Sequence, residues 1–453
     1  MTRKQLQQLS TPELIDVILR LQARVAELEE QIKRLTEPPK DASNSSIPPS
    51  QSAKPNRANR ESKRGPKRGH QGHGRSRQQP DVTVECRPHR CARCGADLTD
   101  VPAKLLGTSQ VVELPPIQPL IIEARRYQVT CPRCAHHQQA DYPPGLGPPR
   151  TFSARLEALV CYFHHVQHVS YERLQKLMGQ VFGLSISQGA IANIIRRAAR
   201  KLQPQAEKIR VTIRASPVIG CDETGARVDG HNQWQWVFET PQASYHLIVP
   251  TRSSQAIEET LGEAEPQVWV SDCFSAQLKA PAKQRQLCLA HQLRNLQYGI
   301  DAQRCGFCYR MQQLLRRAVR LNKHRDRLSP HFFAGQVKAI EAACDQLLAA
   351  PAGTLNGQRL RKRYLKHRDA LFTFLHRVDV PADNNGAERV LRKSVVHRKV
   401  SGGFRSAWGA AAFATMATVL QTAQKQGHDI LTTLTSALEP CPEAPPLTLT
   451  EPS

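Results

Sequence analysis

Three acidic residues are placed where a divalent cation could be held between them. Asp222 ends one predicted strand, Asp272 directly follows another, and Glu388 lies in the first turn of a predicted helix with an Asp or Asn at its N-cap. Carboxylate oxygens suit hard cations such as Mg²⁺, which keep waters and substrate phosphates in their other coordination positions. Taken singly, each acid is also compatible with an ordinary surface carboxylate. The hypothesis therefore depends on a fold that brings the three together.

The elements around these acids follow an order that would do so. The pattern predicts three antiparallel strands, a helix and two further strands, at residues 218–221, 234–238, 245–249, 257–261 (the helix), 268–270 and 287–289. This is the order of a ribonuclease H-like α/β domain, in which the first and fourth strands are neighbours. We therefore expect Asp222 and Asp272 to converge on one edge of the sheet.

Two cysteine pairs predict a second kind of metal site. Cys91 and Cys94 form one Cys-x-x-Cys turn, and Cys131 and Cys134 form another after 36 intervening residues. Four thiolates complete a closed tetrahedral site, so the Zn²⁺ bound there would be structural. The residues between the pairs are strand-like, as a zinc ribbon requires.

A further set of residues has the spacing of a second zinc site. These residues are Cys288, His291, Cys305 and Cys308, and the alternative is that they pack between strands and helices. The chain has 13 cysteines and no signal peptide. The cysteines therefore indicate reduced thiols or metal ligands rather than disulfides.

Positive charge is confined to three blocks of the chain. Residues 54–77, 304–327 and 359–405 carry net charges of +8, +7 and +9, which account for the whole net charge of +24. Such blocks are typical of proteins that bind the phosphates of nucleic acid, with a solvated surface as the alternative. The predicted DNA contacts are Arg64, Lys67, Arg68, Arg389, Arg392, Lys393, Arg398, Lys399 and Arg405. A membrane partner is disfavoured because no apolar run approaches about 18 residues, and we expect a cytoplasmic, nucleoid-associated protein.

The N-terminal region has a heptad pattern. Leu14, Leu21, Leu28 and Leu35 alternate with Ile18, Val25 and Ile32. Branched a positions with Leu d positions favour a parallel dimeric coiled coil, although a helix packed on its own chain shares the pattern. The protein is therefore expected to be a homodimer or a higher assembly.

The remaining segments complete a chain of several domains. Residues 171–181 and 187–202 predict two helices around a Gly183 turn, which fits a helix-turn-helix or two ordinary packed helices. The predicted organisation is a coiled-coil zipper (10–36), a disordered basic arm (37–80), a zinc-ribbon-like DNA-binding domain (81–145), a helical, helix-turn-helix-like domain (151–205), a ribonuclease H-like catalytic domain (212–408) with a helical insertion at about 292–375, a C-terminal helix (409–430) and a disordered tail (440–453).

Several motifs resemble those of one known family. The run Asp383–Ser406, which contains Asn384-Asn385, Ala387-Glu388-Arg389 and Ser401-Gly402-Gly403-Phe404-Arg405, closely resembles the C-terminal signature of the insertion sequence 66 family of bacterial transposases. The segments Asp222-Glu223-Thr224-Gly225 and Cys288-x-Ala290-His291-x-x-Arg294 are also similar, as are the cysteine pairs and the zipper. The resemblance covers most of residues 10–430.

This resemblance implies a DDE-type transposase. Asp222, Asp272 and Glu388 would hold two Mg²⁺ (or Mn²⁺) ions for strand cleavage and strand transfer, and the partners would be double-stranded DNA at the terminal inverted repeats, target DNA and possible accessory proteins of the same element. Two positions depart from the family pattern. Asp272 is followed by Cys273 and Phe274 instead of Gly-Trp, and Gly386 replaces a larger polar residue.

Two alternatives remain open from the sequence. The chain could be a catalytically decayed DNA-binding dimer derived from a transposase, a hypothesis that the altered surroundings of Asp272 keep alive. A junction-resolving or ribonuclease H-like repair nuclease is the other alternative. Such a nuclease would need no zipper, basic arm or zinc ribbon.

Overall fold

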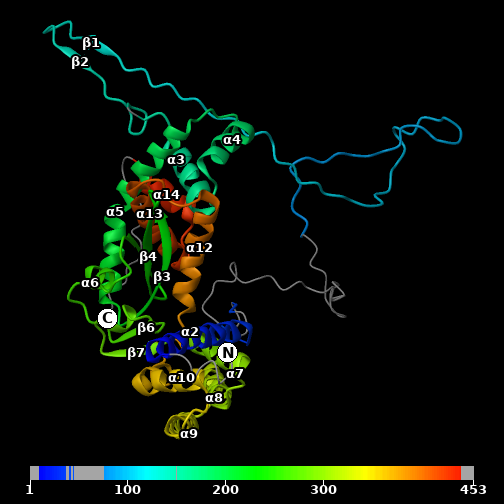
Figure 1. Ribbon diagram of the computed structural model, residues 1–453. Coiled ribbons are helices and arrows are strands. Elements are labelled where there is room, and N and C mark those ends of the chain that lie inside the picture. The colour runs from blue at the N-terminus through cyan, green and yellow to red at the C-terminus, as the bar shows by residue number, and fades with distance from the viewer. Residues whose placement is uncertain (1–9, 37–39, 42–43, 45–75, 149, 440–453) are drawn as a thin grey trace.

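The computed structural model describes residues 10–36, 40–41, 44, 76–148 and 150–439. Most of the predicted basic arm lies outside these residues, including Arg64, Lys67 and Arg68, as does the predicted tail. The described part is a mixed α/β structure with a five-stranded sheet, a separate two-stranded sheet and many helices (Figure 1). No described helix is both long enough and apolar enough to cross a lipid bilayer.

The central sheet has the strand order β5-β4-β3-β6-β7. Its strands are β3 (Val218–Val228), β4 (His231–Glu239), β5 (Ser244–Val249), β6 (Val268–Ser271) and β7 (Gln284–Leu287). Strands β3, β4 and β5 are antiparallel neighbours, whereas β6 runs parallel to β3 and β7 parallel to β6. Helix α6 (Gln255–Leu261) makes the connection from β5 to β6, where the sequence predicts a helix.

Three strands have boundaries that differ from the sequence prediction by three residues or more, and β4 begins at His231 instead of residue 234. Strand β3 continues to Val228, so Asp229 and Gly230 alone form the turn to β4, and both have positive φ angles, 50° and 75°. This two-residue turn matches the right-handed twist of a hairpin. Strand β7 ends at Leu287, because Leu289 already begins the next helix.

The helices before the sheet are α3 (Ala154–Cys161), a π-helical turn (Tyr162–Val166), α4 (Tyr171–Phe182) and α5 (Gln188–Ala215). Gly183 ends α4 in the left-handed conformation, and the Ser187 hydroxyl accepts a hydrogen bond from the Ala190 N–H at the start of α5. The sequence predicts these two boundaries, but α5 continues to Ala215, well beyond its predicted end at residue 202.

The basic side chains of α5 are largely occupied within the chain. Arg196 stacks on Trp408, Arg197 pairs with the buried Glu157, and Lys201 donates to the Leu438 carbonyl. These contacts anchor α5 to its neighbours. They favour the interpretation of α4 and α5 as packed helices over a DNA-reading helix-turn-helix.

The predicted insertion is helical and has a hydrophobic core of its own. It consists of α7 (Leu289–Gln303), α8 (Gly306–Lys323), α9 (Pro330–Ala349), α10 (Leu355–Lys366) and α11 (Thr373–His376), with short 3₁₀ turns at Arg325–Arg327 and Arg368–Ala370. A further 3₁₀ turn, Gln277–Lys279, lies before it, between β6 and β7. The buried side chains Leu315, Ile340 and Leu360 pack in the same cluster as Val268 and Val270 of the sheet. This contact fixes the insertion against β6.

Three helices follow the insertion: α12 (Asn385–Ser401), α13 (Ala407–Lys425) and α14 (Ile430–Leu438). Helix α13 matches the predicted C-terminal helix and packs along β5. The Thr418 and Thr422 hydroxyls accept hydrogen bonds from the His246 and Ser244 N–H groups, so they satisfy the outer edge of the sheet. Helix α14, which the sequence analysis did not predict, packs against α3.

The N-terminal elements are far less packed. Helix α2 (Thr11–Thr36) begins at Ser10, whose N–H and hydroxyl both donate to Glu13. Along its predicted seam Ile18, Leu21 and Val25 are all more than half exposed. The two-stranded sheet, β1 (Gln128–Thr130) and β2 (His137–Gln139), lies at the end of a long extended excursion (Figure 1).

Candidate active site

Asp222 and Asp272 lie at equivalent points of two neighbouring parallel strands. The last residues of β3 and β6 that pair are Gly220 and Val270, and each aspartate is two residues further along. The sequence analysis placed Asp222 at the end of its strand, but β3 continues, paired there only with β4. Asp222 therefore lies where β3 separates from β6, and the two aspartates do converge as expected.

Each aspartate is oriented by a backbone donor. The Glu223 N–H donates to Asp222 Oδ1 (3.0 Å), and the Phe274 N–H donates to Asp272 Oδ1 (2.8 Å). Burial raises the pKa of Asp222 well above its ordinary value, and the negative charges of Glu223, Asp272 and Glu388 raise it further. Carboxylates this close repel one another, and a divalent cation between them would remove the repulsion.

Asn384 fixes the start of α12 to the sheet. Its side-chain amide donates to the carbonyl of Cys221 (2.7 Å), directly before Asp222, and its own N–H donates to Cys288 Sγ (3.2 Å). The approach requires glycine at position 220, because a Cβ there would lie 2.9 Å from Asn384 Oδ1. Asp383 instead caps the helix by accepting from the Asn385 N–H.

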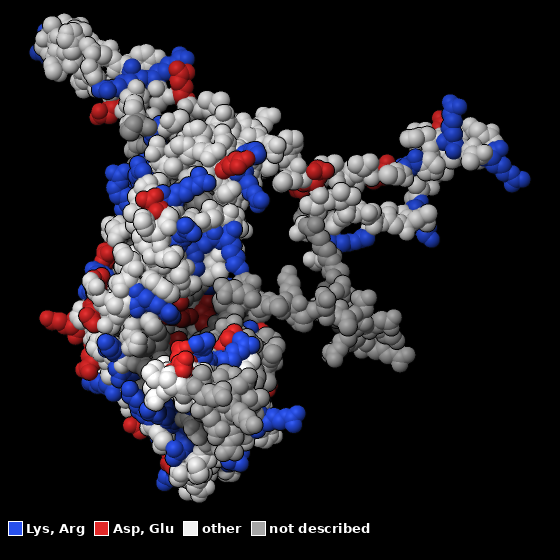
Figure 2. Space-filling model, viewed as in Figure 1, with Lys and Arg blue, Asp and Glu red and all other residues white. Residues whose placement is uncertain are grey.

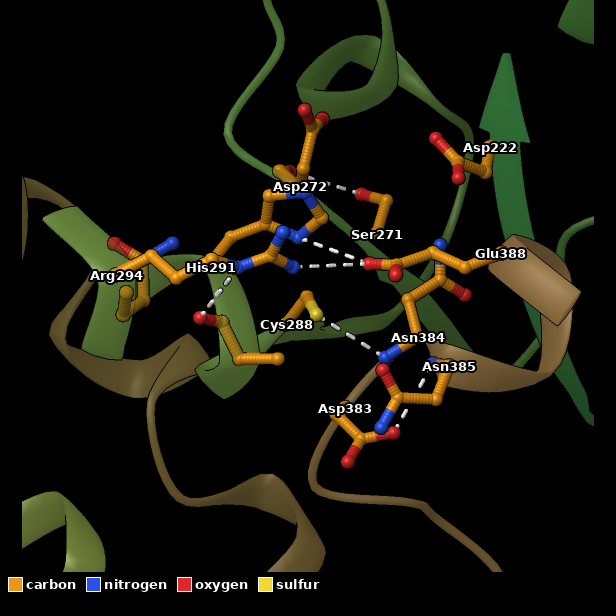
Figure 3. Close-up of polar contacts among 12 residues, drawn as sticks. Asp222, Ser271, Asp272, Cys288, His291, Arg294, Asp383, Asn384, Asn385 and Glu388 are labelled. Atoms are coloured by element: carbon orange, nitrogen blue, oxygen red, sulfur yellow. Dashed lines mark hydrogen bonds and ion pairs between the residues drawn. The ribbon is translucent and has the colours of Figure 1, made fainter. Parts of the chain in front are cut away.

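This anchoring brings Glu388, in the first turn of α12, beside the first turns of α7. Arg294 Nη2 lies 3.3 Å and His291 Nδ1 lies 3.6 Å from Glu388 Oε1. Figure 3 shows the Glu388 carboxylate turned toward these two side chains, with Asp222 on the other side of it. Burial and the charge of Arg294 lower the pKa of His291. The Cys-x-x-His-x-x-Arg spacing, which places three side chains on one face of a helix, was the available sequence signal for this contact.

The closest cluster of potential metal ligands is not the three acids. Within the described residues, one set of three such groups has all its ligand atoms within 4.8 Å of one another, and it is Cys288, His291 and Glu388. Asp222, Asp272 and Glu388 are near enough to influence one another's charge but are spaced more widely. The three acids thus lie near one another, with Glu388 turned toward α7.

The second zinc site suggested by cysteine spacing is not formed as predicted. Cys288 precedes α7 and Cys305 follows it, and the 15 residues of this helix span about 22 Å. Cys305 and Cys308 are buried, and a Cβ at Gly357 or Gly299 would lie 2.7 Å or 2.6 Å from their respective sulfurs. These two thiols pack against neighbouring helices.

Glu223, which the sequence analysis did not assign, is held next to Asp222. Arg252 Nη2 (2.7 Å) and Gln277 Nε2 (2.7 Å) both donate to its carboxylate. The Arg252 guanidinium in turn stacks over Phe274, 4.0 Å from the ring centroid. Phe274 therefore supports the network around Asp222, which gives this unusual residue after Asp272 a structural role.

The two predicted zinc-binding turns are formed separately. Gly95 and Ala135 donate backbone hydrogen bonds to the Cys91 and Cys131 carbonyls and have positive φ angles, as a tight Cys-x-x-Cys turn requires. Backbone N–H groups at positions +2 and +3 lower the pKa of both first cysteines, which favours thiolates. The thiols themselves fit Zn²⁺, but the structure does not bring the two pairs together.

The predicted DNA contacts fall into two groups. Arg389, Arg392, Lys399 and Arg405 are exposed. Arg398 is partly buried, donates to Gln235 and Thr224, and has its pKa lowered to about 10 by burial, so its prediction as a DNA contact is not supported. Lys393, although exposed, contacts Gln424.

Two further features concern the basic surface. The Gly403 turn follows α12, and Phe404 exchanges backbone hydrogen bonds with Arg227 and Asp229, which places Arg405 at the tip of the β3–β4 hairpin. Arg310, Arg317 and Arg320 line an open groove of about 650 Å³ between α8 and α9. Figure 2 shows Lys and Arg side chains over much of the viewed face, with acidic side chains recessed between its upper and lower parts.

The structure also contains a histidine cluster that the sequence analysis did not predict. His164, His165 and His168 from the π-helical region surround His397 of α12, with ring centroids 5.0, 6.0 and 5.6 Å from it. Burial lowers the pKa of His164 to about 4 and of His397 to about 3. The sequence signal was the histidine spacing, which is ambiguous without the partner from α12.

Comparison with protein families gives two matches. The model described as "Transposase IS66 family" matches residues 150–412, which is more than half of the chain. The model described as "zinc-finger binding domain of transposase IS66" matches residues 88–135, which include both cysteine pairs. No curated protein matches the chain.

Proposed function

This chain belongs to the IS66 family of transposases, and we propose that it cuts and joins DNA strands at a divalent-cation site formed by Asp222, Asp272 and Glu388. The observation that carries the proposal is the position of Asp222 and Asp272 at equivalent points of two adjacent parallel strands. The pKa of Asp222 is raised by burial and then by the charges of Glu223, Asp272 and Glu388. A strand order of β5-β4-β3-β6-β7, with the aspartates on adjacent parallel strands, supports a ribonuclease H-like catalytic domain.

The donor set of the aspartates fits Mg²⁺ or Mn²⁺, because both supply hard oxygen ligands. When bound, such cations would activate water or a 3′-hydroxyl and stabilise the charge that develops on the phosphate. The chain's residues would orient this site: the Glu223 and Phe274 N–H groups hold the two aspartates, and Asn384 holds α12 against β3. Glu388 would complete the site by turning from Arg294 toward the aspartates.

DNA would lie across the exposed cations near this site. Arg389, Arg392, Lys399 and Arg405 lie on or just after the helix that carries Glu388, and the arginine groove of the insertion offers a further phosphate-binding surface. The zinc ribbon would add a second DNA-binding module. The exposed seam of α2 supports dimerisation through a coiled coil.

The proposal is tested with purified full-length protein and DNA carrying the element's terminal inverted repeats. We expect nicking with Mg²⁺ or Mn²⁺, and no detectable nicking by Asp222→Asn, Asp272→Asn or Glu388→Gln, with DNA binding retained. Asp229→Asn is the matched control, because this acid lies in the exposed turn of the same hairpin. Unimpaired nicking by any one of the three variants would refute the assignment of that acid.

One observation favours a second candidate function, a DNA-binding dimer without catalysis. Glu388 is held by Arg294 and His291, and its carboxylate is turned away from Asp222. If this contact is permanent, the wild-type protein will bind the inverted repeats but will not nick them with either cation. The same experiment therefore decides between the two functions.

A further inference from the structure

Cys288, His291 and Glu388 form a compact set of mixed ligands. Their ligand atoms lie within 4.8 Å of one another, although the residues come from the start of α7 and the start of α12. Figure 3 shows the three side chains directed toward one another around a common point. Metal-bound ligand atoms need this proximity, and small adjustments of side-chain rotamers would suffice to bring them to one ion.

Backbone N–H groups face the sulfur of Cys288, as they commonly do for a metal-bound cysteine. This sulfur accepts a hydrogen bond from the Asn384 N–H at 3.2 Å, and the His291 backbone N–H also faces it. Burial raises the pKa of the metal-free thiol to about 12, so a cation would have to displace its proton. In the two predicted zinc-binding turns, the first cysteine likewise faces the backbone N–H groups of the residues two and three positions after it. Such donors stabilise a thiolate once a cation has displaced its proton.

His291 supplies an unused ligand atom. Its Nδ1 is buried and has no hydrogen-bond partner within the described residues, and Glu388 Oε1 lies beyond hydrogen-bonding range at 3.6 Å. A buried imidazole nitrogen without a partner is costly, and a bound cation would satisfy it. In the present structure the Arg294 guanidinium provides the positive charge beside Glu388.

The chemistry of the set selects a class of cation. Thiolate, imidazole and carboxylate together suit Zn²⁺ and the similar Co²⁺, whereas Mg²⁺ prefers oxygen ligands alone. Three protein ligands leave one position of a tetrahedral site for water. We propose that Cys288, His291 and Glu388 bind Zn²⁺ at a site distinct from that of the two aspartates, and that this binding withholds Glu388 from them.

The second half of this proposal rests on the proposed function, whereas the first half does not. A cation held between Cys288 and His291 keeps the Glu388 carboxylate on the α7 side of the site. Micromolar Zn²⁺ is then an inhibitor of Mg²⁺-dependent nicking. The binding itself is measurable whether or not the protein nicks DNA.

Cobalt titration of the full-length protein tests the binding. Co²⁺ bound to thiolate gives a visible spectrum, and the zinc-binding turns contribute to it as well, so the assay is run in a Cys91→Ser/Cys131→Ser background. We expect one equivalent of Co²⁺ to bind with a thiolate spectrum in this background, and none after Cys288→Ser is added. His291→Gln is a second variant that retains the sulfur, and it should weaken Co²⁺ binding at least tenfold.

Cys344→Ser is the matched control, because Cys344 is a buried thiol in α9 that belongs to no such ligand set within the described chain. Its cobalt spectrum should equal that of the background protein. Identical spectra with and without Cys288 would overturn the proposed site. Circular dichroism of each variant shows whether it is folded.

The regulatory half is tested by adding Zn²⁺ to the Mg²⁺ nicking assay, with each protein compared with its own rate without Zn²⁺. The variant that adds Cys288→Ser to the Cys91→Ser/Cys131→Ser background should need at least ten times more Zn²⁺ for half-inhibition than the background protein does. Equal sensitivity would overturn the inhibition while leaving the binding result intact. Absence of nicking without Zn²⁺ would instead count against the proposed function.

Discussion

The zinc-ribbon region, residues 76–148, and the body, residues 150–439, differ in what holds them together. In the body Trp236 and Trp269 are fully buried in a continuous core. In the ribbon Leu106 and Ile121 are 92% and 91% exposed, and β1 and β2 have three residues each. Burial of apolar surface can account for the fold of the body but not for that of the ribbon. We therefore expect the ribbon to depend on Zn²⁺ for its tertiary structure.

The largest expected effect is therefore that of removing Zn²⁺. Structural zinc contributes roughly 10 kcal/mol or more of folding free energy in small zinc domains. A chelator should abolish amide-exchange protection in residues 88–139 and leave β3 and β6 protected. Cys131→Ser should have the same effect, whereas Cys86→Ser, an exposed cysteine outside both pairs, should not. Unchanged protection of the ribbon after chelation would contradict the comparison.

The body should lose stability in acid through its buried histidines. The buried histidines have folded-state pKa values near 4 (His164) and 3 (His397), below the ordinary value of about 6.5. Below about pH 6.5 these histidines therefore take up protons when the protein unfolds. The free energy of unfolding is at its full value above this pH and decreases as the pH falls below it. At pH 5 the loss is up to about 2 kcal/mol per histidine.

Thermal unfolding of the body at pH 7 and pH 5 measures this effect. His397→Leu should reduce the difference between the two melting temperatures, because it removes one histidine whose pKa is lowered in the folded state. It also removes a group whose positive charge would lower the pKa of His165. His331→Asn is the control, since His331 is exposed. If His397→Leu melts with the same pH dependence as the wild type, the cluster is not the source of the acid sensitivity.

A smaller effect is expected within the body at the junction of α12 and β3. Asn384→Ala removes the donor to the buried Cys221 carbonyl, which should cost about 1–3 kcal/mol. Because this bond also fixes the distance between Asp222 and Glu388, nicking should fall by more than the loss of folded protein explains. Asn385→Ala, at the neighbouring and less buried position, should have little effect on unfolding by urea. Equal losses for the two variants would argue against the anchoring role of Asn384.

Features set by local sequence patterns were predicted correctly, whereas features set by contacts between distant residues were not. The strand order, the convergence of Asp222 with Asp272 and the helix starts at Ser10 and Ser187 follow from local patterns, and the structure has them. The orientation of Glu388 depends on Arg294, 94 residues away. The spacing of Cys288, His291 and Arg294 shows that these side chains share a helix face, but not that Glu388 meets them.

The sequence also does not show which charged side chains are buried. The basic block 359–405 was interpreted as a phosphate-binding surface, but Arg398 is partly buried between α12 and the sheet. A sequence shows that a residue is charged, whereas only the packing shows whether its charge is free. Helix α14 was not predicted, although Leu431, Leu434 and Leu438 have the spacing of one helical face.

The smallest expected effect separates the arginines that build the body from those available to DNA. Arg405→Ala should weaken DNA binding severalfold and lower the salt dependence of binding by about 0.9 log unit per log unit of salt, because one phosphate contact is lost. Arg398→Ala should leave that slope unchanged and instead lower the melting temperature, since Gln235 and Thr224 lose their partner. Fluorescence anisotropy at several salt concentrations, with melting curves for both variants, measures the two effects. A reduced salt slope in Arg398→Ala would mean that this guanidinium reaches DNA, and that the body moves when it binds.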